Sequence, residues 1–431
     1  MTSASNPSNF NALGLIPELV ARLSDLEYTQ PTPIQAKAIP SILAGHDLIA
    51  GANTGSGKTA AFALPILQKI SQGALKRDAK GNYVSALILV PTRELATQVA
   101  DNVKSYSAYF NGAIKTMAVF GGVSVNTQMQ ALRGGADIIV ATPGRLLDLI
   151  SSNAIKLDKV NTLVLDEADR LLSLGFTEEL AELLALMPAK KQTMLFSATF
   201  PEQVMLLTQE LLKNPLEIQL QNKDESTLVQ RVFTVNKGEK TTVLAHLIKQ
   251  QQWRQALIFV NAKKDCEHLA NKLEKRGINA QVFHGDKGQS ERTRVIEKFK
   301  AGEIDVLIAT DIAARGLDIE KLPVVINFNL PRSPADYMHR IGRSGRAGEV
   351  GLALSLIDYE DFHHFRIIEK KNKLRLEREQ VGGFEVNKAN LDAAQALKSD
   401  KPMAKPEGTG KKKKKNKVNK EDDVWSSWRR K

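Results

Sequence analysis

Three carboxylates follow directly on a run of apolar residues in the stretch 163-LVLDEADRLL-172. The apolar run is typical of a strand buried in a sheet, and Asp166, Glu167 and Asp169 come at its end. Carboxylates crowded in this way repel one another unless a cation compensates their charge. Taken alone, such a stretch is also common as the solvated, acidic start of a helix. It therefore indicates a cation site only if other residues give the cation a purpose.

A second pattern supplies that purpose. Residues 48-LIAGANTGSGKTAAF-62 run from an apolar strand through a turn of small residues into a helical stretch. In such a turn, backbone N–H groups and the helix N-terminus surround phosphate oxygens, and a lysine reaches the outer phosphates of a nucleotide. We assign Lys58 to the phosphates and the Thr59 hydroxyl to Mg²⁺. The other phosphate contacts fall to Ala52, which replaces the usual first glycine, and to Thr54, Gly55, Ser56 and Gly57.

The carboxylates complete this site. Asp166 is expected to hold Mg²⁺, directly or through a water, and Glu167 to activate or position the attacking water. The candidate catalytic residues of this stretch and the turn are thus Lys58, Asp166 and Glu167, acting on a nucleoside triphosphate with Mg²⁺.

A repeat indicates the elements that must position these residues. The apolar runs 86-ALILV-90 and 137-DIIVATPGRLLD-148 begin 51 residues apart, and 256-ALIFV-260 and 305-DVLIATDIAARGLD-318 begin 49 apart. Each pair brackets an amphipathic segment, as expected of parallel strands joined by crossover helices. The sequence therefore predicts an α/β protein with two parallel-sheet domains in tandem.

The net charge is unevenly distributed along the chain. The 431 residues carry a formal net charge of +12, of which +8 falls in residues 401–431. That segment holds 411-KKKKK-415, Trp425 and Trp428 and has no apolar periodicity, so we expect a disordered basic tail.

A single cysteine, Cys266, excludes an internal disulfide framework, and no apolar run approaches the ~20 residues needed to span a bilayer. We expect a soluble, cytoplasmic protein.

These motifs together resemble the DEAD-box ATP-dependent RNA helicases over roughly residues 8–368, and the short basic tail is similar to that of the bacterial RhlE-like type. The Asp166-Glu167-Ala168-Asp169 stretch is the one that names the family. Phe10 and 28-YTQPTPIQ-35 resemble its adenine-recognition motif, with Glu27 where the family usually has glycine. The other matching segments are 91-PTRELA-96, 121-GG-122, 142-TPGR-145, 197-SAT-199, 289-QSER-292, 309-ATDIAARGLD-318 and 339-HRIGRSGR-346.

The resemblance implies roles for these segments. Phe10 would stack on adenine, Gln35 would hydrogen-bond its edge, and Asp318 would contact the ribose. Arg343 and Arg346 would act on ATP as arginine fingers, and we place both on one face with Arg340 because the three are spaced by three residues. Ser197 and Thr199 would couple hydrolysis to strand separation. The expected RNA-binding residues are Thr92, Arg93, Gly122, Thr142, Gly144, Arg145, Arg292 and Thr310, whose hydroxyls, amides and guanidinium groups suit the RNA backbone.

The family's fold implies two tandem RecA-like domains. We expect an ATP-binding domain over 1–215, a linker over 216–228, a helicase domain over 229–370 and a largely disordered tail over 371–431. ATP would close the two domains on each other, and RNA would lie across both.

Other functions remain open from the sequence. A DNA translocase shares the paired-domain core, and an ATP-gated RNA clamp or assembly scaffold would carry the same motifs. The tail is either an RNA anchor or a solvated segment without a role. RNA is the expected partner, as single strands and short duplexes read largely without regard to sequence, with ribosomal or degradation complexes as candidates.

Overall fold

The computed structural model describes residues 9–51, 55–75, 81–110, 114–219, 228–314, 322–345 and 351–386. Of the predicted site residues, Ala52, Thr54, Asp318 and Arg346 lie outside these ranges, as does most of the expected tail. The described chain divides into two compact units, one ending at Gln219 and the other beginning at Leu228.

The first unit is built on a seven-stranded parallel sheet with the order β3-β4-β2-β5-β6-β1-β7. Its strands are β1 (Leu48–Gly51), β2 (Val84–Leu89), β3 (Thr116–Val119), β4 (Ala136–Ala141), β5 (Thr162–Leu165), β6 (Gln192–Ser197) and β7 (Leu216–Gln219). Its helices are η1 (Phe10–Leu13), α1 (Pro17–Asp25), α2 (Pro33–Leu43), α3 (Lys58–Ser71), α4 (Arg93–Tyr106), η2 (Ser107–Tyr109), α5 (Val125–Ala131), α6 (Pro143–Ser151), α7 (Ala168–Ser173), α8 (Thr177–Ala185) and α9 (Glu202–Leu211).

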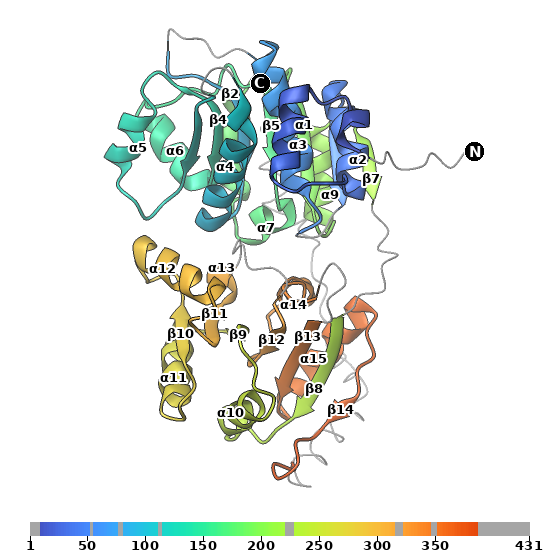
Figure 1. The fold of residues 1–431 in the computed structure, drawn as a ribbon, viewed down its shortest axis with the longest axis vertical. Helices are drawn as coiled ribbons and strands as arrows, with labels where there is room; N and C mark the ends of the chain where they lie inside the picture. Colours follow the sequence, from blue (N-terminus) through green and yellow to red (C-terminus); the bar gives the residue numbers. More distant parts are fainter. Residues whose placement is uncertain are drawn as a thin grey trace, which may run out of the picture. The chain divides into compact units, whose positions relative to one another are not determined.

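Helices cover both faces of this sheet (Figure 1). Successive side chains of β2 alternate between the two cores: Ile88 packs with α1 to α4, and Leu87 and Leu89 pack with α6 to α9. This is why the strand is apolar without alternation, since both of its faces are buried.

The second unit repeats the plan with the strand order β10-β11-β9-β12-β13-β8-β14. Its strands are β8 (Leu228–Thr234), β9 (Ala256–Val260), β10 (Ala280–Phe283), β11 (Val306–Thr310), β12 (Val324–Asn327), β13 (Gly351–Ile357) and β14 (Arg378–Glu379). Its helices are α10 (Lys240–Gln250), α11 (Lys263–Glu274), α12 (Gln289–Lys300), α13 (Asp311–Ala314), α14 (Pro334–Ile341) and α15 (Asp361–Asn372). The two sheets correspond strand by strand, so the prediction of two tandem parallel-sheet α/β domains is confirmed.

Each sheet has an edge strand whose residues lie outside the expected domain range. Strand β7 pairs with β1, although its residues were assigned to the linker, and it extends the first sheet beyond residue 215. Strand β14 pairs with β8, although its residues were assigned to the tail. Edge strands expose one side to water and carry polar residues, so their sequences do not show the apolar runs that mark central strands.

Within the described ranges, no helix combines the length and the apolar character that a membrane crossing requires.

Candidate functional site

Lys58 begins α3 directly after the small-residue turn that follows β1. Gly57 precedes it with φ +89°, and Gly55 has φ +73°, conformations that glycine adopts at no steric cost. The lysine side chain is 7% exposed, and its Nζ lies 3.7 Å from Asp166 Oδ1. Among the described residues no group accepts a hydrogen bond from this ammonium. A buried cation without acceptors is costly, so the site is built for an anion that Lys58 can contact.

The second unit offers a direct comparison. Lys240 begins α10 after β8, the strand that corresponds to β1 in the sheet order. Its ammonium is also buried, but it lies 3.1 Å from Asp358 Oδ2 and 2.6 Å from Asp361 Oδ2. Both of these carboxylates lie within hydrogen-bond distance of the Lys240 ammonium, whereas the Asp166 oxygen nearest to Lys58 lies 3.7 Å away. This difference favours the first unit as the phosphate site, and the assignment of Lys58 to the phosphates stays a prediction.

Asp166 follows β5 and is 3% exposed. Burial raises the pKa of its carboxyl group, while the nearby Lys58 ammonium opposes the rise. A buried carboxylate whose charge is disfavoured gains from a bound cation. Together with the Thr59 hydroxyl at the start of α3, the carboxylate fits the oxygen ligands that Mg²⁺ prefers.

Glu167 adopts left-handed backbone angles, φ 52° and ψ 52°. Such angles cost a residue with a side chain about 1–3 kcal/mol. The Glu167 backbone N–H donates to Asp166 Oδ1 at 2.9 Å, and Arg170 Nη1 donates to Glu167 Oε2 at 3.2 Å. Both partners of this ion pair are buried. The strained turn thus holds the Glu167 carboxylate beside Asp166.

The third carboxylate has a role that the sequence analysis missed. Asp169 Oδ2 accepts hydrogen bonds from the Thr199 backbone N–H at 3.0 Å and from its hydroxyl at 2.6 Å. Ser197 Oγ in turn accepts from the Asp169 N–H at 3.2 Å and donates to the Thr199 carbonyl at 2.7 Å. The two residues predicted to couple hydrolysis to strand separation are therefore bonded directly to the acidic turn. Only the adjacency of β5 and β6 makes this contact possible.

Gln35 also has a contact that was not predicted. Its Oε1 accepts from the Thr32 N–H at 2.9 Å at the start of α2, and its Nε2 donates to the Gly57 carbonyl at 3.1 Å. A Cβ at Gly57 would lie 2.4 Å from Gln35 Nε2 and would displace this amide, and the φ of +89° also favours glycine there. Each amide atom keeps one further bonding position, which leaves adenine recognition available to it. Phe10 is 4% exposed in the core of the first unit, and its stacking on adenine stays a prediction.

The predicted RNA-binding residues of the first unit gather at one edge of the sheet. They follow β2, β3 and β4, which are neighbours. The Arg93 guanidinium fills the space that a Cβ at Gly122 would need, and Gly122 has φ +86°. Arg145 Nη1 donates to the Val123 carbonyl at 3.0 Å, which ties the residues after β3 to α6. Thr92 and Thr142 stand at the N-termini of α4 and α6, and Gly144 has open space around its Cα.

In the second unit, α14 ends at Ile341, so Arg340 lies on the helix and Arg343 in the turn that follows it. Arg346 lies outside the described residues, so the shared face of the three arginines stays a prediction. Arg343 is 4% exposed, and its carbonyl accepts from the Leu322 N–H at 3.0 Å. Arg292 is 5% exposed with its guanidinium 4.7 Å from the centre of the Phe283 ring. Thr310 ends β11. The RNA contacts of Arg292 and Thr310 stay predictions.

Comparison with known proteins agrees with this arrangement. Residues 32–207 match the DEAD/DEAH box helicase family, and residues 239–348 match the helicase conserved C-terminal domain. The chain is 41% identical over 372 residues to the ATP-dependent RNA helicase CshA of Listeria monocytogenes, covering 86% of this chain and 70% of that protein. It is 39% identical over 381 residues to the ATP-dependent RNA helicase DeaD of Escherichia coli, covering 88% and 59%. Its structure is similar to S. cerevisiae Dbp5 bound to RNA and ADP BeF3, with TM-score 0.77, 30% identity and coverage of 91% and 100%.

Proposed function

The chain belongs to the DEAD-box family of ATP-dependent RNA helicases, and from that premise we propose that it couples RNA-stimulated ATP hydrolysis to local separation of short RNA duplexes or to remodelling of RNA–protein complexes. The observation that carries the proposal is the buried Lys58 ammonium beside Asp166 and Glu167, for which the described part of the chain offers no hydrogen-bond acceptor. In the second unit, the corresponding Lys240 forms ion pairs with Asp358 and Asp361. The lack of a close acceptor therefore distinguishes Lys58 from its counterpart.

In the proposed mechanism each residue of the acidic turn has one task. Lys58 binds the outer phosphates, Thr59 and Asp166 hold Mg²⁺, and Glu167 accepts a proton from the attacking water or orients it. Mg²⁺, when bound, neutralises phosphate charge as it develops. Asp169 keeps Thr199 attached to the turn, so a change at the phosphates reaches the coupling segment through two hydrogen bonds.

Arginine completes the proposed catalytic set. Arg343 and Arg346 belong to the second unit, so their role requires the two units to come together on ATP. An arginine finger typically raises the rate by ~10³–10⁵.

The proposed RNA contacts are hydroxyls, glycine amides and guanidinium groups, which bind the sugar–phosphate backbone rather than base edges. We therefore expect RNA to be bound largely without regard to sequence.

The test compares two measurements on the full chain. The rate at which a short RNA duplex is unwound with ATP is set against the lifetime of the RNA complex formed with a non-hydrolysable ATP analogue. Unwinding faster than dissociation of the analogue complex supports the helicase function. ATP hydrolysis with a long-lived complex and no unwinding would instead identify an ATP-gated clamp.

The cellular setting is a further proposal. We propose that the protein acts in the cytoplasm on single strands and short duplexes, including those of ribosomal or RNA-degradation complexes. Crosslinking to RNA in cells, followed by sequencing of the bound RNA, would identify the target, and recovery of no RNA would contradict the proposal.

A further inference from the structure

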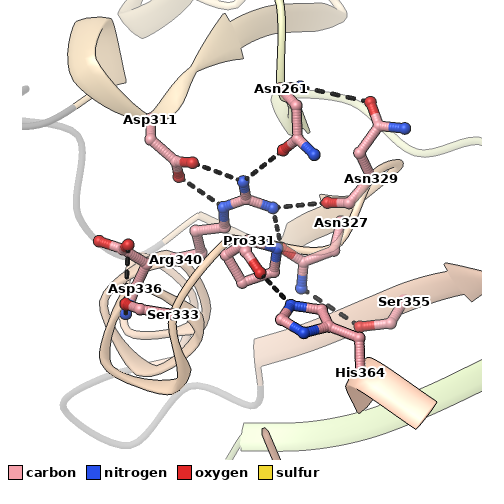
Figure 2. Close-up of polar contacts among 10 residues, drawn as sticks. All are labelled: Asn261, Asp311, Asn327, Asn329, Pro331, Ser333, Asp336, Arg340, Ser355 and His364. Atoms are coloured by element: carbon pink, nitrogen blue, oxygen red, sulfur yellow. Dashed lines mark hydrogen bonds and ion pairs between the residues drawn. The ribbon is translucent and has the colours of Figure 1, made fainter. Parts of the chain in front are cut away.

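Arg340 is 2% exposed and is the largest fully buried side chain in the described structure. Figure 2 shows its guanidinium surrounded by oxygen atoms from separate segments. Nε donates to Asp311 Oδ1 at 2.5 Å, and Nη2 donates to Asp311 Oδ2 at 2.6 Å. The remaining acceptors are Asn327 Oδ1 at 3.0 Å, the Asn329 carbonyl at 2.6 Å and Asn261 Oδ1 at 3.3 Å. The guanidinium also lies 4.9 Å from the centre of the Phe259 ring.

These acceptors come from the carboxyl ends of three neighbouring strands. Asn261 follows β9, Asp311 follows β11 and Asn327 ends β12, and the sheet order is β11-β9-β12. One side chain from α14 therefore fixes that helix to the edge of the sheet at three points. We name these five residues (Asn261, Asp311, Asn327, Asn329 and Arg340) the Arg340 cluster.

The cluster lies between two residues with proposed roles. Asp311 directly follows Thr310, a proposed RNA contact at the end of β11. Arg340 lies three residues before Arg343, and the Arg343 N–H donates to the Arg340 carbonyl at 3.2 Å. A shift of Asp311 would thus move Arg340, and through the backbone turn it would move Arg343.

The Arg340 side chain is 2% exposed and that of Asp311 is 20% exposed. Burying a charge carries a desolvation cost, and apolar residues of similar volume are often as stabilising or more so, which makes the pair weak evidence for a purely stabilising role. What a bidentate Arg–carboxylate pair adds is geometry, because two parallel hydrogen bonds fix the orientation of both groups.

We propose that the Arg340–Asp311 pair is a positioning device that sets Arg343 in response to RNA at Thr310. The inference rests on the proposed function, since it gives Arg343 the role of arginine finger. Arg340 itself then contacts neither ATP nor RNA, and it acts through Arg343.

The experiment measures ATP hydrolysis by the full chain with and without saturating RNA for Asp311→Asn, Arg340→Lys and the double variant. Asp311→Asn keeps the size and one acceptor oxygen but removes the charge. Because a misplacement of about 1 Å can cost about a hundredfold in rate, we expect each variant to lower RNA-stimulated kcat by about tenfold or more. RNA-independent hydrolysis and the KM for ATP should stay near wild type. The double variant should be no worse than the single variants, because all three break one pair.

Ser333→Ala is the matched control. Ser333 Oγ accepts from the Asp336 N–H at 3.1 Å at the start of α14, outside the Arg340 cluster (Figure 2). This change loosens the same helix without altering the ion pair, so it should lower thermal stability while the ratio of RNA-stimulated to RNA-independent kcat is kept. If that ratio is also kept in Asp311→Asn and Arg340→Lys, or if the two changes add independently, the positioning role is wrong. Full activity of Arg343→Ala would instead show that the proposed finger role fails.

Discussion

Two lysines begin helices at corresponding places in the two sheets, and only their neighbours distinguish them. Lys240 has two carboxylates within 3.1 Å, whereas Lys58 has one carboxylate oxygen at 3.7 Å. An ammonium that is already satisfied has little to gain from a phosphate, and a buried ammonium without acceptors has much to gain. The chemistry of the molecule is thus decided by single residues placed on a repeated scaffold.

At this scale, Glu167→Gln should stop turnover but keep ATP and RNA binding. The Gln amide oxygen can still accept the hydrogen bond from Arg170 Nη1, so the strained turn is preserved and only the base is lost. Loss of a general base typically costs ~10²–10⁴ in rate. Steady-state ATP hydrolysis with saturating RNA and equilibrium nucleotide binding are the measurements. Lys58→Ala is the contrasting variant, because it should abolish nucleotide binding itself, and an active Glu167→Gln enzyme would overturn the assignment.

Gln35 should make ATP the preferred nucleotide. Its amide can pair with the donor and acceptor edge of adenine, and guanine presents the reverse pattern, so kcat/KM for ATP should exceed that for GTP by at least about tenfold. Gln35→Ala should remove this preference. It should also weaken binding of both nucleotides, because the contact to the Gly57 carbonyl is lost. Equal kcat/KM values for ATP and GTP in the wild-type protein would show that Gln35 does not read the base.

At the scale of elements, the carboxyl ends of adjacent strands bring motifs together. The acidic turn after β5 meets the proposed coupling segment after β6, and the segments after β2, β3 and β4 bring the proposed RNA contacts together.

The attachment of the edge strand β14 depends on side chains as well as on its few backbone hydrogen bonds. Arg231 on β8 donates to both carboxylate oxygens of Glu379, and Arg378 does the same to Glu369.

The attachment of β14 should therefore depend on pH. The hydrogen bond from Arg231 is the main cause that holds the pKa of Glu379 below its ordinary value of 4.5. A depressed pKa in the folded state stabilises the fold above the unfolded pKa, and this contribution is lost as the pH falls through the folded value. Glu379→Gln should thus speed hydrogen exchange in residues 228–234 at pH 7, by a factor consistent with a partly exposed pair worth about 1 kcal/mol or less. At a pH below the depressed value the variant and wild type should exchange alike, and an equal difference at both pH values would contradict the assignment.

At the scale of the whole molecule, the predicted basic tail lies outside the described residues and can be tested only in solution. Lysines and arginines that contact an RNA backbone release counterions, and Trp425 and Trp428 can stack on unpaired bases. Deleting residues 401–431 should leave kcat at saturating RNA nearly unchanged and raise the apparent KM for RNA. Each lost contact should also reduce the log–log salt slope by ~0.7 for single strands. RNA titrations of both proteins at several salt concentrations are the measurement, and superimposable curves would leave a solvated tail without a role.

Local patterns in the sequence were sufficient to predict the fold class, and they also indicated the centre of the candidate site. Buried parallel strands are apolar on both faces, so the repeat was visible as matching apolar runs, and a phosphate turn is a continuous segment that carries Lys58 and Thr59 next to each other. The three carboxylates likewise stood together in the chain. The edge strands β7 and β14 gave no such signal, because a polar strand is recognisable only by its partner.

Tertiary structure alone decided the contacts between segments. The hydrogen bonds that join Asp169 to Thr199 and Gln35 to Gly57 link residues 30 and 22 positions apart. Arg340 stands in a motif with Arg343, yet only the structure shows that α14 ends at Ile341 and that Arg340 pairs with Asp311. Residue type and spacing along the chain limit which chemistry is possible. Which groups meet depends on strand order and helix ends, because hydrogen bonds and ion pairs act only over a few ångströms.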